Sequence, residues 1–214
     1  MTVLETIYIT VLGSSFIVSL ISFRWNFPFH LKFFSLLLGL TFLVELCAIP
    51  IFRTFSLGTN SQVYTPFMLV EFCAYTFYYR QILKNRNLLT SLLLLVVVLT
   101  WLISTIFIFG FFKWNSYISI TGCCCTIILA VCYYGQLLRS SEPVKLLRQP
   151  EFFIATGMLI FYSCQLPFLG ALNYLVNNHY ELARSLLRVL QILNIVMYSL
   201  FTFAFLCNLT PKKL

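Results

Sequence analysis

The chain has 214 residues, of which 60% are hydrophobic and only 9% are charged. Soluble domains average about 25% charged residues, so this composition excludes an ordinary soluble protein and is typical of an integral membrane protein. The net charge of +8 does not indicate nucleic-acid binding, because the basic residues lie in short links beside apolar segments rather than on one basic face.

Apolar segments long enough to cross a bilayer as a helix, which takes about 20 residues, follow one another along the whole chain. In chain order they are 2–23, 31–52, 63–83, 88–112, 117–138, 151–175 and 182–209. These segments are continuous, and they are longer than the alternating strands of a membrane β-barrel. The sequence therefore predicts an all-α bundle of seven transmembrane helices that forms a single integral membrane domain over residues 1–214.

The first segment does not resemble a cleavable signal peptide, because Glu5 precedes the apolar run and no basic residue does. Orientation follows from the Lys and Arg residues of the links, which are enriched on the cytoplasmic side of membrane proteins. One side would hold Arg24, Lys32, Arg80, Lys84, Arg86, Arg139, Lys145, Arg148, Lys212 and Lys213, and the other only Arg53, Lys113 and Arg184. This asymmetry predicts an N-terminus outside the cell and a C-terminus in the cytoplasm.

The third segment carries one carboxylate, Glu71, in the middle of an apolar and aromatic run. Residues three, four and seven positions from it share its helical face. These residues are Tyr64, Phe67, Met68, Tyr75 and Tyr78. Because an ionisable group at membrane depth is costly unless something relieves it, Glu71 is a candidate functional residue.

Two other segments carry polar groups at a similar depth. The second contains Glu45, and the seventh has a helical stripe of Arg184, Arg188, Gln191, Asn194 and Tyr198. At about 1.5 Å per residue, Glu45, Glu71 and Arg188 fall within about 3 Å of one another in depth. We therefore predict a Glu45–Arg188–Glu71 cluster in the outer half of the bundle, which is either a ligand site or a structural staple between helices.

The sixth segment adds polar groups to this predicted site, next to a proline at position 167. The complete candidate ligand- or ion-binding set is Glu45, Glu71, Tyr75, Tyr162, Gln165, Arg188, Gln191, Asn194 and Tyr198.

No metal, cofactor or catalytic group is predicted. The eight cysteines lie inside apolar segments without a CxxC or Cys/His pattern, and the chain has no aspartate and only two histidines. HExxH and GxSxG motifs are also missing from the sequence. An enzyme is therefore not the main expectation, although a lipid-modifying enzyme with a glutamate base stays open.

Three stretches, Asn60 to Tyr79, Pro150 to Leu166 and Leu187 to Cys207, carry recognisable patterns. The first has Asn and Tyr before an internal Glu71–Phe72 pair, and the last has Asn194 followed by an Ile and a Tyr. In these patterns the chain resembles a family of small, uncharacterised bacterial seven-helix membrane proteins. The resemblance implies a multi-pass protein of the bacterial cytoplasmic (inner) membrane, and it implies no particular activity.

The polar residues at membrane depth favour a sensor or receptor-like module that binds a small ligand, proton or cation in an intramembrane pocket. Its expected partners are the lipid bilayer and a separate cytoplasmic or membrane signalling protein, and no nucleic acid. A small transporter or proton-coupled channel built from the same residues is the first alternative, and an intramembrane lipid-modifying enzyme is the second.

Overall fold

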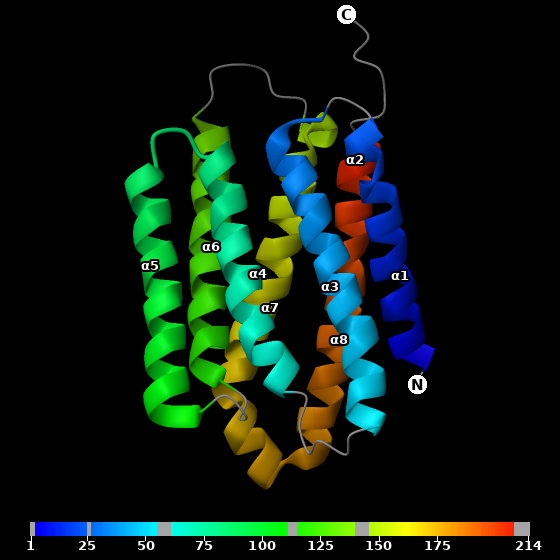
Figure 1. Ribbon diagram of the computed structural model, residues 1–214, viewed down its shortest axis with the longest axis vertical. Helices are drawn as coiled ribbons and strands as arrows, with labels where there is room; N and C mark the ends of the chain where they lie inside the picture. Colours follow the sequence, from blue (N-terminus) through cyan, green and yellow to red (C-terminus); the bar gives the residue numbers. More distant parts are fainter. Residues whose placement is uncertain (1–2, 25–26, 55–60, 111–114, 140–145, 208–214) are drawn as a thin grey trace, which may run out of the picture.

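The computed structural model describes residues 3–24, 27–54, 61–110, 115–139 and 146–207, and within these ranges every regular element is a helix (Figure 1). The elements are α1 (Val3–Ser19), α2 (Ile21–Arg24), α3 (Phe29–Thr54), α4 (Ser61–Ile82), α5 (Asn87–Ile103), the π-helix η1 (Ser104–Phe109), α6 (Ser116–Leu138), the 3₁₀-helix η2 (Leu146–Arg148), α7 (Pro150–Asn178) and α8 (Tyr180–Cys207). Each of the predicted segments contains one long helix. The predicted all-α bundle is thus confirmed for the described residues.

Six of the described helical segments are long and apolar enough to cross a membrane. They are Val3–Arg24, Phe29–Ala48, Asn87–Ile108, Ser116–Leu138, Pro150–Leu172 and Glu181–Cys207. Helix α4 is not among them, although its 22 residues give it a sufficient length. Its sequence includes Pro66, Glu71, Arg80 and several tyrosines, which lower its hydropathy.

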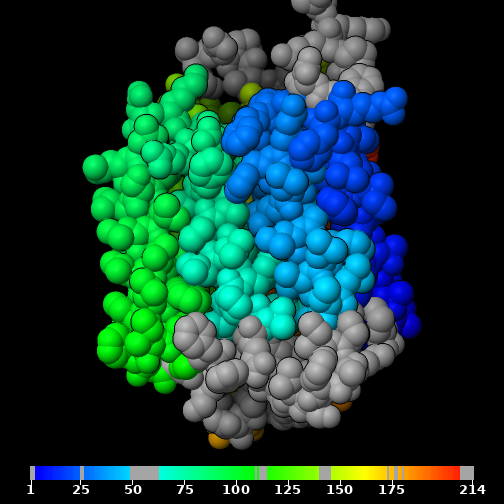
Figure 2. Space-filling model, viewed as in Figure 1, coloured from blue at the N-terminus to red at the C-terminus, as the bar shows by residue number. Residues whose placement is uncertain are grey.

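The more polar helix α4 packs against three neighbouring helices and keeps one face at the surface (Figure 2). It lies between α3 and α5 on the face shown in Figures 1 and 2, and it also packs against α6. Further contacts join α6 to α7, α7 to α8, α8 to α1 and α1 to α3. These contacts close a ring of α1, α3, α4, α6, α7 and α8, and α5 packs on the outside of this ring against α4 and α6.

The outer surface of α5 and of η1, which continues it, is strongly apolar. Leu88 and Phe107 are 78% and 79% exposed, and Leu92, Leu95 and Leu99 are also exposed. A contiguous apolar surface of this kind marks contact with lipid or with another apolar partner. The long helical segments with exposed apolar side chains therefore suit a multi-pass membrane protein.

The ordinary α-helix of α5 ends earlier than the predicted segment 88–112, because it changes to the π-helix η1 at Ser104. Asn115, which is fully buried, donates from Nδ2 to Ser104 Oγ at 2.6 Å and to Thr105 Oγ1 at 3.2 Å. Its Oδ1 accepts from the backbone N–H of Ile118 at 3.2 Å and so caps the start of α6. One side chain thus ties the end of α5 to the beginning of α6.

Four buried aromatic side chains form a layer across the interior of the helical ring. Phe34 of α3 packs against Tyr75 and Tyr78 of α4 and against Phe201 of α8, with ring centroids 6.5, 5.1 and 5.1 Å away. All four side chains are at most 3% exposed. We call Phe34, Tyr75, Tyr78 and Phe201 the aromatic layer.

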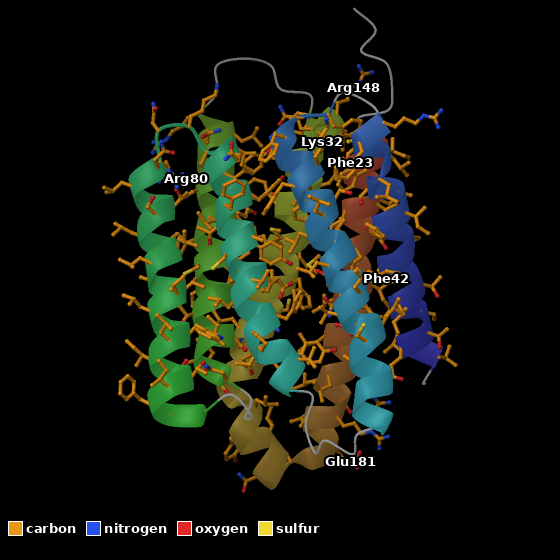
Figure 3. All side chains as sticks on the ribbon, viewed as in Figure 1. Phe23, Lys32, Phe42, Arg80, Arg148 and Glu181 are labelled. Atoms are coloured by element: carbon orange, nitrogen blue, oxygen red, sulfur yellow. The ribbon has the colours of Figure 1, made fainter. Side chains whose placement is uncertain are left out.

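Most basic residues of the described chain gather at one end of the bundle, where α3 and α7 begin and α4 and α6 end, whereas Arg53, Arg184 and Arg188 lie toward the other end. Figure 3 labels Lys32, Arg80 and Arg148 at this end, which we call the cationic end, and Glu181 at the opposite end. Arg24, Lys84, Arg86 and Arg139 belong to the same end by their positions at the ends of α2, α4 and α6. Lys113, Lys145, Lys212 and Lys213 lie outside the described residues, and which end faces the cytoplasm stays a prediction.

Candidate functional site

A cavity of about 240 Å³ lies on the other side of the aromatic layer from the cationic end. Its lining comes from all helices of the ring: α1, α3, α4, α6, α7 and α8. The polar lining residues are Tyr8, Thr41, Glu45, Tyr64, Glu71, Ser119, Tyr162, Gln165, Asn194 and Tyr198, and the apolar ones are Phe67, Met68, Phe72, Phe161 and Met197. We call it the glutamate–tyrosine cavity.

Glu45 of α3 is held by two tyrosine hydroxyls from different helices. Tyr8 of α1 donates to Oε1 at 3.0 Å, and Tyr64 of α4 donates to Oε2 at 2.9 Å. Hydrogen bonds to an ionised acceptor are about twice as strong as neutral ones. The carboxylate therefore has one donor on each oxygen and a fixed position between three helices.

Glu71 of α4 accepts a hydrogen bond from a tyrosine of its own helix. Tyr75, one turn further along, donates to Glu71 Oε1 at 2.7 Å. The ring of Tyr75 packs against the ring of Tyr162 from α7, with centroids 5.9 Å apart. Tyr75 also belongs to the aromatic layer, so Glu71 lies at the inner end of the cavity, next to that layer.

Acidic side chains outnumber basic ones in the described lining of this cavity. Glu45 and Glu71 both line it, and its described lining contains no lysine, arginine or histidine. Removing a carboxylate from water costs on the order of several kcal/mol, and each hydrogen bond to a charged group returns only about 1.5–3 kcal/mol. The tyrosine hydroxyls thus offset part of this cost, and a bound cation or proton would offset the rest.

The structure brings most of the predicted site residues together. Glu45, Glu71, Tyr162, Gln165, Asn194 and Tyr198 line the cavity, and Tyr75 hydrogen-bonds one of its carboxylates. The amide oxygen of Gln165 lies 3.7 Å from Cys123 Sγ, which donates to it.

Arg188 requires a correction, because the structure does not place it between the two glutamates. Its side chain is exposed, and its guanidinium donates to Ser185 Oγ at 3.3 Å on the same helix. In this part of α8 the inward face is formed by Ala183, Leu186 and Leu190, which pack in a small core with Phe168 of α7. Arg188 is two positions from Leu190 and so lies on the opposite side of the helix.

Gln191 is half-buried and is not part of the cavity lining. The predicted Glu45–Arg188–Glu71 cluster therefore becomes a cluster of two glutamates and tyrosine hydroxyls, with Asn194 and Tyr198 as the contribution of α8.

Two contacts of this site were missing from the sequence-based prediction. Tyr8 was not considered, although it is six residues from the outer start of its segment, a depth similar to that of Glu45 and Glu71. Tyr64 was placed on the face of Glu71, but its hydroxyl binds Glu45. Counting residues from the outer end of the first segment would have placed Tyr8 at the level of the glutamates. Which of the two carboxylates Tyr64 binds depends on how α3 and α4 pack.

Within the described residues, no three His, Cys, Asp or Glu side chains gather in a way that could hold a metal ion. Comparison of the chain with protein-family models, with curated proteins and with solved structures finds no match. Fold and site together define a membrane-type helical bundle with an acidic, tyrosine-lined cavity, and the bacterial family resemblance stays a prediction based on its motifs.

Proposed function

We propose that the chain is a multi-pass membrane protein that binds a small organic cation in the glutamate–tyrosine cavity and acts as a receptor-like module. The observation that carries this proposal is the meeting of Glu45 and Glu71 in one cavity whose described lining has no basic side chain. Attraction between opposite charges is several-fold stronger in a protein interior than in water. A cation is therefore the ligand that this lining would favour most.

Aromatic rings in the lining support an organic cation rather than a bare metal ion. The rings of Tyr8 and Tyr198 are 6.0 Å apart, and those of Phe72 and Tyr162 are 5.9 Å apart. Aromatic faces attract ammonium groups within about 6 Å of the ring centroid, whereas Ca²⁺ and Mg²⁺ require about six or more oxygen ligands. The 240 Å³ volume is smaller than the roughly 300–1,000 Å³ of drug-sized pockets, so the ligand would be an amine or a quaternary ammonium with few carbon atoms.

In this proposal the protein lies in a bacterial cytoplasmic membrane with its N-terminus outside, and the cavity opens toward the outside. The aromatic layer packs between the cavity and the cationic end, which favours binding without passage of the ligand. Signalling would then reach a separate partner at the cationic end.

Transport of the same cation is the second candidate, and one observation favours it. The hydroxyl groups of Tyr78 and Tyr79 are buried and have no hydrogen-bond partner among the described residues, and Tyr78 belongs to the aromatic layer between the cavity and the cationic end. Buried hydroxyls of this kind usually have a partner, and a solvated open state would provide one. Uptake of a radiolabelled quaternary ammonium into proteoliposomes distinguishes the two candidates, since a receptor gives saturable binding without accumulation.

Cations should stabilise the protein against heat, and neutral molecules of the same shape should not. The experiment measures thermal unfolding of the detergent-purified protein with tetramethylammonium or choline, and with 3,3-dimethylbutan-1-ol, the neutral isostere of choline. A ligand at one hundred times its Kd adds about 2.7 kcal/mol to the free energy of unfolding. Equal stabilisation by choline and its neutral isostere would contradict the proposal, and sodium chloride at the same ionic strength is the control for screening.

A further inference from the structure

A second and larger cavity, of about 830 Å³, opens at the cationic end. It is lined by the beginning of α3 and α7, the end of α6 and the turn that joins α4 to α5. We call it the cationic cavity. It is separated from the glutamate–tyrosine cavity by the aromatic layer, and the proposed cation binding makes no use of it.

Positive charge dominates the lining of this cavity. Lys84, Arg86 and Arg139 all line it. Glu151, the one acidic residue in the described part of the lining, is already engaged, because its Oε1 lies 2.7 Å from Nε2 of His30. This is the one contact between a basic and an acidic side chain found among the described residues, so none of the three basic side chains has a carboxylate partner in that part of the chain.

The turn that carries Lys84 and Arg86 is fixed to α6. The backbone N–H of Lys84 donates to Gln136 Oε1 at 2.7 Å, and Gln136 Nε2 donates to the carbonyl oxygen of Ile82 at 3.2 Å. Asn85 takes a left-handed backbone conformation, with φ of 56°, which reverses the chain between the two basic residues. The basic side chains thus extend from a positioned turn rather than from a loose link.

Arg139 lines the same cavity from the end of α6. It is the C-cap residue of that helix and lies three residues beyond Gln136. Arg86 is oriented by a contact between Nη1 and Cys132 Sγ, which are 3.4 Å apart. The excess of Lys and Arg at this end is explained by membrane topology alone. Topology does not explain why three of these residues, from two separate segments, line one cavity.

We infer that the cationic cavity binds a phosphate ester. A guanidinium group presents paired N–H donors that match two oxygens of a phosphate, and an ammonium group adds a point charge. The amides of Gln81, Asn85 and Gln149 also line the cavity and supply further donors. The volume of about 830 Å³ falls within the roughly 300–1,000 Å³ of small-molecule sites, so there is room for the alcohol part of the ester.

The phosphate ester has two possible sources, a lipid headgroup and a soluble metabolite. The cavity opens where the apolar helices end, which is the level of the headgroups in a bilayer. Leu138 and Leu147, which are 86% and 73% exposed, lie at the same end and would contact acyl chains. The shared chemistry is the phosphate ester, and the experiment separates the two sources.

The test is native mass spectrometry of the protein purified in dodecyl maltoside, a phosphate-free detergent. The probes are phosphatidylglycerol, glycerol 3-phosphate and, as the phosphate-free lipid, dioleoylglycerol. The site variant is Arg86→Gln with Arg139→Gln. The matched control, Arg80→Gln with Arg148→Gln, removes the same charge from the same end at residues outside the lining. Thermal unfolding checks that both variants are folded, and Lys84→Gln, at an exposed position, replaces the site variant if that variant does not fold.

We expect phosphatidylglycerol, glycerol 3-phosphate or both to bind the wild type, and the phosphate-free lipid not to bind. The site variant should lose at least about tenfold in affinity, and the control variant should lose less than about threefold. Binding of the lipid alone assigns the site to a headgroup, and binding of glycerol 3-phosphate assigns it to a soluble ester. The inference is overturned if neither phosphate compound binds, if dioleoylglycerol binds equally well, or if the site and control variants lose affinity alike.

Discussion

Gly122→Ala should lower the free energy of unfolding by about 1–3 kcal/mol, the usual cost of adding volume to a packed interior. Gly122 of α6 faces the ring of Phe72 on α4, and a Cβ atom at this position would overlap that ring. Phe72 cannot move freely, because its ring packs against Tyr75 and Tyr162 with centroids 6.3 and 5.9 Å away. Since Phe72 also lines the glutamate–tyrosine cavity, the displaced ring should change the cavity shape and weaken cation binding.

The matched control is Gly170→Ala on α7, where a new Cβ atom would meet no atom within 4 Å. Alanine favours a helix over glycine by about 1 kcal/mol, so this variant should be as stable as the wild type or slightly more stable. Adding Phe72→Leu to Gly122→Ala should restore part of the lost stability. Thermal unfolding in detergent measures all of these variants, and wild-type stability and wild-type cation binding for Gly122→Ala would show that α4 and α6 do not pack as described.

Replacing Glu45 and Glu71 together by glutamine should leave the ligand-free protein at least as stable as the wild type. A glutamine keeps one side-chain oxygen to accept from Tyr64 or Tyr75, and it removes the cost of burying an ionised group in a cavity whose described lining has no basic side chain. We expect a gain of about 0–3 kcal/mol in the free energy of unfolding. Binding sites commonly cost stability in this way.

The opposite result has an equally clear physical meaning. If the glutamates act as a structural staple, the double variant should lose more than about 3 kcal/mol, as happens when a buried polar network is broken. Thermal unfolding without added cation measures the difference. Thr41→Val, at a buried lining position whose hydroxyl donates to the Leu37 carbonyl oxygen of its own helix, is the control for a general loss of polarity in the cavity.

The position of the two glutamates could be predicted from the sequence because depth in a bilayer depends only on helix ends. The predicted segments 31–52 and 63–83 lie close to α3 and α4, so counting residues from their outer ends placed Glu45 and Glu71 at one level. Both residues also lie on helices that pack against each other. Simple counting was therefore sufficient for this part of the site.

The contribution of α8 could be predicted only in part, because the face that a helix turns inward depends on its packing partners. The polar stripe from Arg184 to Tyr198 has the right period, but the face toward α7 follows Ala183, Leu186 and Leu190 instead. Asn194 and Tyr198 lie close enough to that inward face to reach the cavity, and Arg188 does not. The period of the polar residues predicts that they share one face of the helix, and tertiary contacts decide whether that face points into the bundle.

The charge balance of the site also depended on tertiary structure. The sequence predicted that an arginine would pair with the two glutamates, whereas in the structure tyrosine hydroxyls donate hydrogen bonds to them. Tyr8 reaches Glu45 from a helix that is far away in the sequence, and no local pattern connects the two residues. The cavity is consequently more acidic than the sequence indicated, and this difference leads to the proposal of a cationic ligand.

The most direct test of a cation site is a calorimetric titration of tetramethylammonium into the purified protein and into the variant with Glu45→Gln and Glu71→Gln. We expect saturable binding with one site per wild-type chain. Losing both carboxylates should weaken this binding at least about a hundredfold, because each charge-assisted contact contributes about 1.5–3 kcal/mol. No binding to the wild type, or equal binding to the two proteins, would contradict a cation site in the glutamate–tyrosine cavity.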